Sequence, residues 1–316
     1  MNIHIQWAVA TLKAQGYLIQ NTTPEIIQQT PWSDVCRFLT NQGYIYLKKT
    51  PPALSQESTI ISILHEQFHA HVPQIIADNP EQHCFLMQSA GITLREFFKQ
   101  GFKPDLLVQA VQHYTAIQLM TVNKLSLFLE KGALDWRLDK LPTLYQELIE
   151  QEDLLSEDGL TPEEIKKLRG LSSKLSFHCE HLSHYNIPET FGHCDFHDNN
   201  ILINTETHQI TLIDLGEVAI THPFFSFLNP LHRARESYAL TDDQYQDLQV
   251  SCFKNWLPLE SPAHLFEILF IMRKCWSIHS VLGEYRLMHS VDPVAFQALH
   301  REGRLAKNLR FWLKQA

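Results

Sequence analysis

The chain has 316 residues, of which 44% are hydrophobic and 19% charged, and its formal net charge is −9. This length accommodates one large domain or two modest ones, and the apolar content is sufficient for a sizeable core. General nucleic-acid binding requires a basic face, so an acidic chain is not expected to bind nucleic acid. The six cysteines are scattered and form no CxxC pair, which is typical of reduced thiols in a cytoplasmic protein.

The chain also lacks the signals of a membrane or secreted protein. Its first 15 residues contain no basic n-region and no small-residue cleavage site, so we expect no secretory signal. The longest apolar run, 266–272, is interrupted by one Glu and is far shorter than the roughly 20 residues that span a bilayer. We therefore expect no membrane partner, and the sequence carries no signal for an oligomeric state.

The first 90 residues are expected to form mostly strands. Segments 36–40 and 44–48 flank Asn-Gln-Gly, a combination that predicts a β-hairpin. Segment 51–68 begins with Pro and predicts a helix, because its apolar residues recur at helical spacing. Two more short strands are predicted at 73–78 and 83–89.

After residue 90 the patterns become helical. Segments 105–122 and 161–182 predict amphipathic helices. The region 240–316 also predicts helix, interrupted by Pro258, Pro262 and Pro293. The strongly acidic segment 147–164 is interpreted as a solvated loop and helix start.

Residues 193–200 concentrate side chains of the metal-ligand type: His193, Asp195, His197, Asp198, Asn199 and Asn200. Two short apolar segments, 201–203 and 210–214, follow and predict a hairpin that ends at Asp214. The hairpin would fix the distance between Asp214 and the loop that carries Asp195 and Asn200. Carboxylate and amide oxygens are hard ligands suited to Mg²⁺.

The same loop permits a second interpretation. His193, Asp195 and His197 alternate in the sequence, so a strand-like backbone would place all three on one side, as in a transition-metal site. That interpretation leaves Asn200 and Asp214 without a role.

The pattern H-x-D-x-x-x-x-N, followed by an apolar strand and Ile-Asp, resembles the catalytic signature of the aminoglycoside phosphotransferase and choline kinase-like family, relatives of the protein kinases. Segment 44–49 is similar to the strand that carries the ATP-binding Lys, 55–64 to the following helix with its Glu, and 91–98 to the segment after the hinge. The resemblance implies an α+β, bilobal protein-kinase-like fold. Residues 1–88 would form an N-lobe of antiparallel sheet with one main helix, and residues 89–316 a mostly helical C-lobe.

The resemblance also implies roles in the catalytic loop. Asp195 would accept the proton of the substrate hydroxyl, and His193 would brace the loop by hydrogen bonding. Asn200 and Asp214 would hold Mg²⁺ against the phosphates of ATP.

In the N-lobe, Lys48 would contact the phosphates and Glu57 would pair with it, although two such residues can also form an ordinary surface ion pair. Strand alternation places Lys48 and Lys49 on opposite faces, and only Lys48 follows Leu47 as the family Lys follows an apolar residue. The nucleotide base would lie at a hinge in 85–90, around Met87.

The sequence departs from the family in the phosphate-covering loop and in the catalytic loop, where Asp198 and Asn199 stand at positions that are Pro or Gly in many relatives. It contains no G-x-G-x-x-G, and the candidate phosphate-covering loop is 29–35, where Ser33 would offer a hydroxyl and a backbone donor. Cys194 stands where many relatives have Gly.

The implied function is ATP- and Mg²⁺-dependent phosphorylation of a hydroxyl on a small polar molecule, such as an amino alcohol or amino sugar. A non-catalytic nucleotide-binding protein on the same fold is an alternative, disfavoured because every motif residue is present. A protein kinase is less favoured because no long activation segment follows Asp214.

Overall fold

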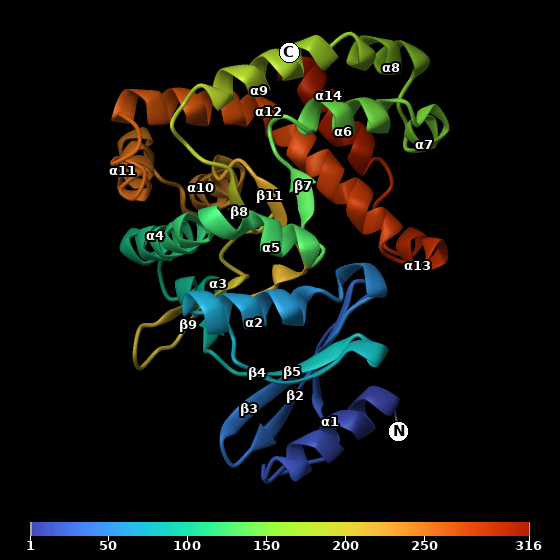
Figure 1. Ribbon diagram of the computed structural model, residues 1–316, viewed down its shortest axis with the longest axis vertical. Coiled ribbons are helices and arrows are strands. Elements are labelled where there is room, and N and C mark those ends of the chain that lie inside the picture. Colours follow the sequence, from blue (N-terminus) through green and yellow to red (C-terminus); the bar gives the residue numbers. More distant parts are fainter. Residues whose placement is uncertain (1, 316) are drawn as a thin grey trace.

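An antiparallel sheet of five strands, in the order β1-β2-β3-β5-β4, forms the core of the N-terminal lobe in the computed structural model, which describes residues 2–315. Helix α1 covers one face of this sheet and α2 the other, as Figure 1 shows. The bounds of these elements are α1 (Ile3–Ala14), β1 (Glu25–Thr30), β2 (Ser33–Thr40), β3 (Gly43–Lys49), α2 (Glu57–Phe68), β4 (Ile75–Asn79) and β5 (Cys84–Gln88).

Strand β3 divides its side chains between the two faces of the sheet. Ile45 and Leu47 are buried with Ala8 and Leu12 of α1 in a small core. Lys48, opposite Phe85 of β5, therefore faces away from α1 and towards the C-terminal lobe. The predicted hairpin of 36–40 and 44–48 is confirmed, with Thr40 paired to Gly43 at its turn.

The C-terminal lobe is mostly helical. Its helices are α3 (Leu94–Phe98), α4 (Pro104–Thr121), α5 (Leu125–Glu130), α6 (Leu141–Ile149), α7 (Glu152–Glu157), α8 (Pro162–Arg169), α9 (Ser172–Ser183), α10 (Phe224–Tyr238), α11 (Asp242–Cys252), α12 (Pro262–His289), α13 (Pro293–Gln297) and α14 (Arg304–Gln315). None of the helices in residues 2–315 combines the length and the apolar character needed to cross a bilayer.

Two small sheets also belong to the C-terminal lobe and pack among its helices. One contains β6 (Ile92–Thr93), β9 (Ile201–Ile203) and β10 (Ile210–Leu212), all antiparallel. The other contains β7 (Leu134–Trp136), β11 (Ala219–Thr221) and β8 (Thr190–Gly192). Together they hold both ends of the segment from β8 to β11, so that its loops are placed against the N-terminal lobe.

The predicted α+β class with two lobes is confirmed. The single helix predicted over 161–182 is wrong, because the chain forms α8 and α9 with a turn at residues 170 and 171. Gly170 is the C-cap of α8, and Gly is among the poorest helix formers, which favours an interruption at this position. Helix α1 was not predicted, and the three-residue strands β7, β8 and β11 were also missed.

Candidate active site

Lys48 joins two carboxylates at the boundary between the lobes. Its Nζ lies 2.7 Å from a carboxylate oxygen of Glu57 in α2 and 2.6 Å from Oδ1 of Asp214. Lys48 and Glu57 are buried, with 5% and 1% of their surface exposed, whereas the Asp214 side chain is 45% exposed. A buried lysine with two acidic partners is not an ordinary surface ion pair, which was the alternative interpretation of Lys48 and Glu57.

Electrostatics keep Lys48 and Asp214 charged, whereas burial raises the pKa of Glu57. Burial alone lowers the pKa of Lys48, but the negative charges of Asp214 and Glu57 outweigh burial and raise that pKa above its ordinary value. Burial acts to raise the pKa of Asp214, and the Lys48 ammonium overcomes it, so that this pKa is lowered. Lys48 is therefore cationic and Asp214 anionic at neutral pH.

His193 braces the loop that follows β8. Its ring is fully buried, and Nε2 lies 2.8 Å from the carbonyl oxygen of Ile213, the residue before Asp214. Because a carbonyl can only accept, Nε2 carries the proton in this bond. The backbone N–H of His193 donates to the hydroxyl of Tyr114 in α4 at 2.7 Å. Burial lowers the pKa of His193, which favours a neutral ring that positions the loop.

Asp195 lies in the cleft with its carboxylate 43% exposed. Its Oδ2 accepts a hydrogen bond from the amide nitrogen of Asn200 at 3.0 Å and lies 3.2 Å from Nε2 of His197. His193 and His197 are thus engaged with different partners. No group of three or more His, Cys, Asp or Glu side chains within residues 2–315 could hold a metal ion, so the transition-metal interpretation gains no support.

Two residues of the site have left-handed backbone conformations. Cys194 and Asp214 both have φ 64°. Non-glycine residues in this region are uncommon and cluster at functional sites, where the surrounding structure holds them in place. Glycine adopts such a conformation without steric cost, so Cys194 holds a backbone conformation that a glycine would adopt more easily.

The oxygens of Asn200 and Asp214 fit a hard divalent cation. Asn200 uses its amide nitrogen on Asp195, and its amide oxygen hydrogen-bonds to no other residue of the described chain. Asp214 uses Oδ1 on Lys48 and leaves Oδ2 without a partner among residues 2–315. The backbone N–H of Ile213 donates to the carbonyl of Asn200 at 3.0 Å, so the two ligand candidates come from adjacent segments.

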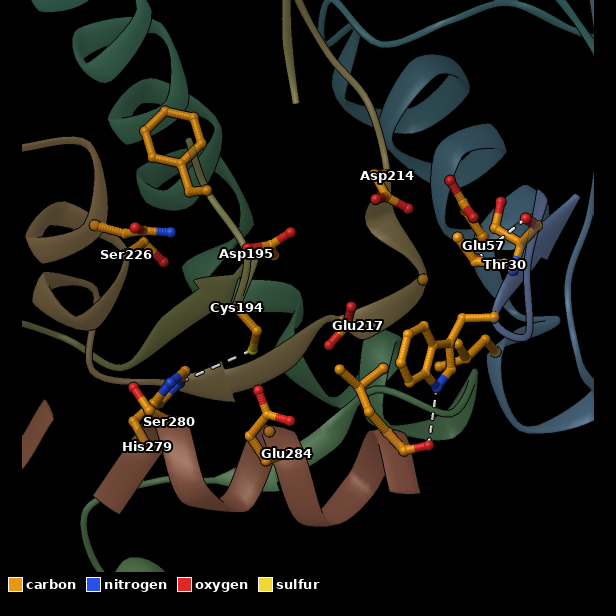
Figure 2. A pocket seen from close by; sticks show the side chains of 18 of the residues that line it. Thr30, Glu57, Cys194, Asp195, Asp214, Glu217, Ser226, His279, Ser280 and Glu284 are labelled. Atoms are coloured by element: carbon orange, nitrogen blue, oxygen red, sulfur yellow. Dashed lines mark hydrogen bonds between the residues drawn. The ribbon is translucent and has the colours of Figure 1, made fainter. Parts of the chain in front are cut away.

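Lys48, Glu57, Asp195 and Asp214 line one cavity of about 490 Å³ between the lobes (Figure 2), whereas His193, His197 and Asn200 do not border it. At one end are Lys48, Glu57 and Asp214, with Ser33 from the N-terminal lobe. At the other end the wall is aromatic and polar and comes from β7, the loop after β8, α10, α12 and the chain near α14. Its residues are Trp136, Phe196, Phe225, Ser226, Asn229, Trp276, His279, Ser280, Glu284, Arg301 and Arg304. Asp195 borders both ends.

Glu217 lies in the cavity near Asp195 and Asp214, as Figure 2 shows. Burial, with added repulsion from these two carboxylates, raises the pKa of Glu217 to about 8. A cation bound beside Glu217 would favour its ionised form. Deeper in the same wall, burial lowers the pKa of His279 to about 3, so its ring is neutral.

The two predicted nucleotide contacts at the edge of the site have different surroundings. Ser33 lines the cavity, but its backbone N–H already donates to Oγ1 of Thr30 at 3.0 Å, and only its hydroxyl has no partner in the described chain. Met87 pairs with Tyr46 and packs against the main core. Neither Met87 nor any other residue of 85–90 lines this cavity.

No role was assigned from the sequence to the aromatic residues that line the cavity, and Trp136 and Trp32 show why. Trp136 ends a three-residue strand that no periodic pattern announces. Trp32 was within the candidate loop 29–35 but received no role, although its ring lines the cavity from the N-terminal lobe. The only available signal was a Trp next to Pro at the centre of a predicted loop.

Comparison with known proteins is consistent with this geometry. Residues 31–245 match the sequence model of a family described as the phosphotransferase enzyme family. No sequence among the curated proteins matches the chain.

Solved structures of phosphotransferases share its fold. The ADP-bound aminoglycoside phosphotransferase APH(2'')-Ib has a TM-score of 0.59 at 16% identity, over 100% of this chain and 99% of that one. The ethanolamine kinase of Plasmodium vivax has 0.58 at 12%, over 100% and 89%. An amicoumacin kinase in complex with AMP-PNP, Ca²⁺ and Ami has 0.57 at 11%, over 98% and 93%. At these identities the likeness shows a common fold.

Proposed function

Because this chain belongs to the phosphotransferase enzyme family, we propose that it transfers the γ-phosphate of ATP, with Mg²⁺, to a hydroxyl of a small neutral or cationic molecule. One observation carries the proposal. Asp195 is exposed to the same cavity in which buried Lys48 faces Asp214, so a proton acceptor and a phosphate-binding cation share one enclosed space. Phosphoryl transfer requires positioning and charge stabilisation more than covalent chemistry, and this cavity is suited to both.

Each step of the proposed reaction is assigned to a particular group of the site. The hydroxyl oxygen of the acceptor forms a bond to the γ-phosphorus, and a carboxylate oxygen of Asp195 accepts the proton that this hydroxyl loses. The bond from that phosphorus to the β–γ bridging oxygen breaks, and ADP leaves with the electron pair. Lys48 contributes positive charge at the phosphates, and Glu57 holds the ammonium in place.

Asn200 and Asp214 would hold the metal ion through the free oxygens described above. Bound Mg²⁺ would neutralise phosphate charge that no single side chain can balance. His193 fixes the distance between the Asp195 loop and Asp214 through its bond to Ile213.

The charge of the cavity wall supports a neutral or cationic acceptor. The lining contains the carboxylates of Glu57, Asp195, Asp214 and Glu284 and three cations, Lys48, Arg301 and Arg304. It also contains the carboxyl group of Glu217, whose pKa of about 8 leaves it mostly neutral at pH 7. Glu284 already pairs with Arg301 and Arg304, so these arginines are not free for an anionic acceptor. An amino alcohol or an amino sugar fits this balance, with aromatic rings to cover its carbon skeleton.

A protein acceptor is disfavoured because little chain is available between Asp214 and α10. That segment contains only the short helix Leu215–Glu217 and strand β11 before Phe224. It leaves no room for a long activation segment. The non-catalytic alternative is disfavoured because Lys48, Glu57, Asp195, Asn200 and Asp214 are all present.

A screen of amino alcohols, amino sugars, aminoglycosides, neutral sugars and hydroxy acids with ATP and Mg²⁺ tests the acceptor class. Mass spectrometry of the products would detect each phosphorylated compound. We expect phosphorylation of a neutral or cationic compound. Selective phosphorylation of an anionic hydroxy acid would contradict the acceptor class, and transfer only to protein would contradict the small-molecule function.

A further inference from the structure

The tip of the β1–β2 hairpin touches the opposite lobe through one side chain. Nε1 of Trp32 donates a hydrogen bond of 2.9 Å to the backbone carbonyl of Leu287, near the C-terminal end of α12. The Trp32 ring also meets Phe296 of α13 edge-on, with ring centroids 6.3 Å apart. Residues 255 positions apart in the chain are thus joined across the cleft.

An ion-pair cluster supports the same contact. The guanidinium of Arg301 lies over the Trp32 ring, 5.0 Å from its centroid. Arg301 bonds to both carboxylate oxygens of Glu284, and Arg304 adds a third bond to this group. A guanidinium held in this way presents a fixed face to an aromatic ring, which is the geometry of a cation–π contact.

The β1–β2 hairpin and the end of α12 that it contacts form two walls of the active-site cavity. Thr30, Trp32 and Ser33 line it from the N-terminal lobe. Glu284 and Leu287 line it from α12. The Trp32 contact therefore closes the cavity on the side of the β1–β2 hairpin, which also borders Lys48 and Asp214 in the same cavity.

We propose that Trp32 is a positioning residue that fastens the β1–β2 hairpin to α12 and so retains the nucleotide in the cleft. This role rests on the proposed function. Because the bond spans the two lobes, ADP leaves only after Trp32 has separated from Leu287 and Arg301. Closing segments of this kind often control product release.

Three variants isolate the contact. Trp32→Phe keeps an aromatic ring over Arg301 and removes the N–H donor, and Trp32→Ala removes both. Tyr44→Ala is the matched control, because Tyr44 stacks on Arg37 at 4.2 Å in the same sheet and does not line the cavity. Trp32 is at a hairpin tip outside the buried cores, so these variants are expected to fold.

Two measurements test the proposal. In the free protein, hydrogen exchange should become faster in the hairpin tip and at the end of α12 in Trp32→Ala but not in Tyr44→Ala. With ADP and Mg²⁺, stopped-flow dissociation should be about fivefold faster in Trp32→Phe, roughly the factor that one hydrogen bond contributes, and faster still in Trp32→Ala.

Wild-type exchange and dissociation rates in both Trp32 variants would overturn the proposal. If the wild-type protein binds no nucleotide, the proposed function fails, and with it the retaining role of Trp32. The exchange measurement would then still decide whether Trp32 fastens the hairpin to α12.

Discussion

At the scale of single residues, the choice between Lys48 and Lys49 determines where the cation of the site lies. The two are neighbours in β3, but Lys48 is buried against Glu57, whereas Lys49 borders a shallow surface pocket beside α1. Strand alternation alone predicts this division, because successive side chains point to opposite faces.

Lys48→Ala is expected to weaken binding of ATP with Mg²⁺ by about tenfold or more, since a hydrogen bond to a charged group contributes about 1.5–3 kcal/mol. Lys49→Ala is the matched control and should change the affinity by less than about twofold. Isothermal titration calorimetry of both variants would measure the difference. Equal losses in the two variants would mean that the nucleotide does not bind on the Lys48 face.

Glu217 should make stability depend on pH. Its pKa is about 8 in the folded protein and near the ordinary 4.5 in the unfolded chain, so the folded state holds the proton more tightly. The stabilisation is complete below about pH 4.5 and is lost as the pH rises through 8. Glu217→Gln removes this dependence, because the amide does not titrate.

Urea unfolding at pH 5.5 and pH 8.5 would measure the effect. Relative to wild type, the free energy of unfolding of Glu217→Gln should increase by up to a few kcal/mol between these two pH values. Glu206→Gln, on an exposed turn, should show no such change. A pH-independent difference between Glu217→Gln and wild type would show that the Glu217 carboxyl ionises normally in the folded state.

At the scale of elements, the joint between the lobes depends on a close backbone approach. Gly91, next to β6, has φ 129°, and a Cβ added there would lie 2.2 Å from the carbonyl oxygen of Ile203 in β9. Gly101 has the same φ, but a Cβ added there meets nothing within 4 Å. Substituting Ala at Gly101 therefore measures the cost of backbone strain alone, and substituting Ala at Gly91 measures that strain together with the steric clash.

Gly91→Ala should destabilise the protein more than Gly101→Ala, because the clash is with backbone that cannot rotate away. Strain alone costs on the order of 1–3 kcal/mol, and the clash should add to it. Thermal unfolding of both variants would measure the difference. Similar losses of stability in the two variants would indicate that β6 and β9 can move apart at little cost in free energy to accommodate the added Cβ.

Elements with a strong local pattern were predictable from the sequence. The β2–β3 hairpin, α2 and the β9–β10 hairpin each combine a turn or start signal with regular apolar spacing. Helix α1 was missed because its first residues alternate between apolar and polar as in a strand, and only Ala8 and Leu12 are buried. Strands β7, β8 and β11 are too short for any periodicity and depend on pairing between distant segments.

The same division applies to the site. The motif residues of 193–214 could be placed together because one hairpin connects them. The aromatic wall could not, because Trp136, Phe225 and Trp276 come from separate elements that meet only in the folded chain.

At the scale of the whole molecule, polar contacts at the cleft join the two lobes in addition to the apolar core that α2 shares with the C-terminal lobe and the contact of Trp32 with α12. Besides Lys48 and Asp214, the side chain of Gln56 donates to the carbonyl of Gly216 at 2.7 Å, and Glu57 accepts from the N–H of Leu215 at 3.2 Å. A ligand that binds both lobes should therefore stabilise the entire fold.

ATP with Mg²⁺ at a hundred times its dissociation constant should add roughly 2.7 kcal/mol to the free energy of unfolding. Asp214→Ala should lose most of the Mg²⁺-dependent part of this stabilisation, and Asp243→Ala, on the exposed start of α11, should retain it. Thermal shifts with and without Mg²⁺ would measure both. An unchanged Mg²⁺-dependent shift in Asp214→Ala would remove Asp214 from the metal site.

The central claim is that Asp195 takes the proton of a small-molecule hydroxyl during phosphoryl transfer. Its most direct test is single-turnover transfer from ATP labelled at the γ-phosphate to the compounds of the acceptor screen, in wild type and in Asp195→Asn. We predict labelled product from the wild type and a rate about 10²–10⁴-fold lower in Asp195→Asn, with nucleotide affinity nearly unchanged. Transfer at the wild-type rate by Asp195→Asn, or no transfer by a wild-type protein saturated with ATP and Mg²⁺, would contradict the claim.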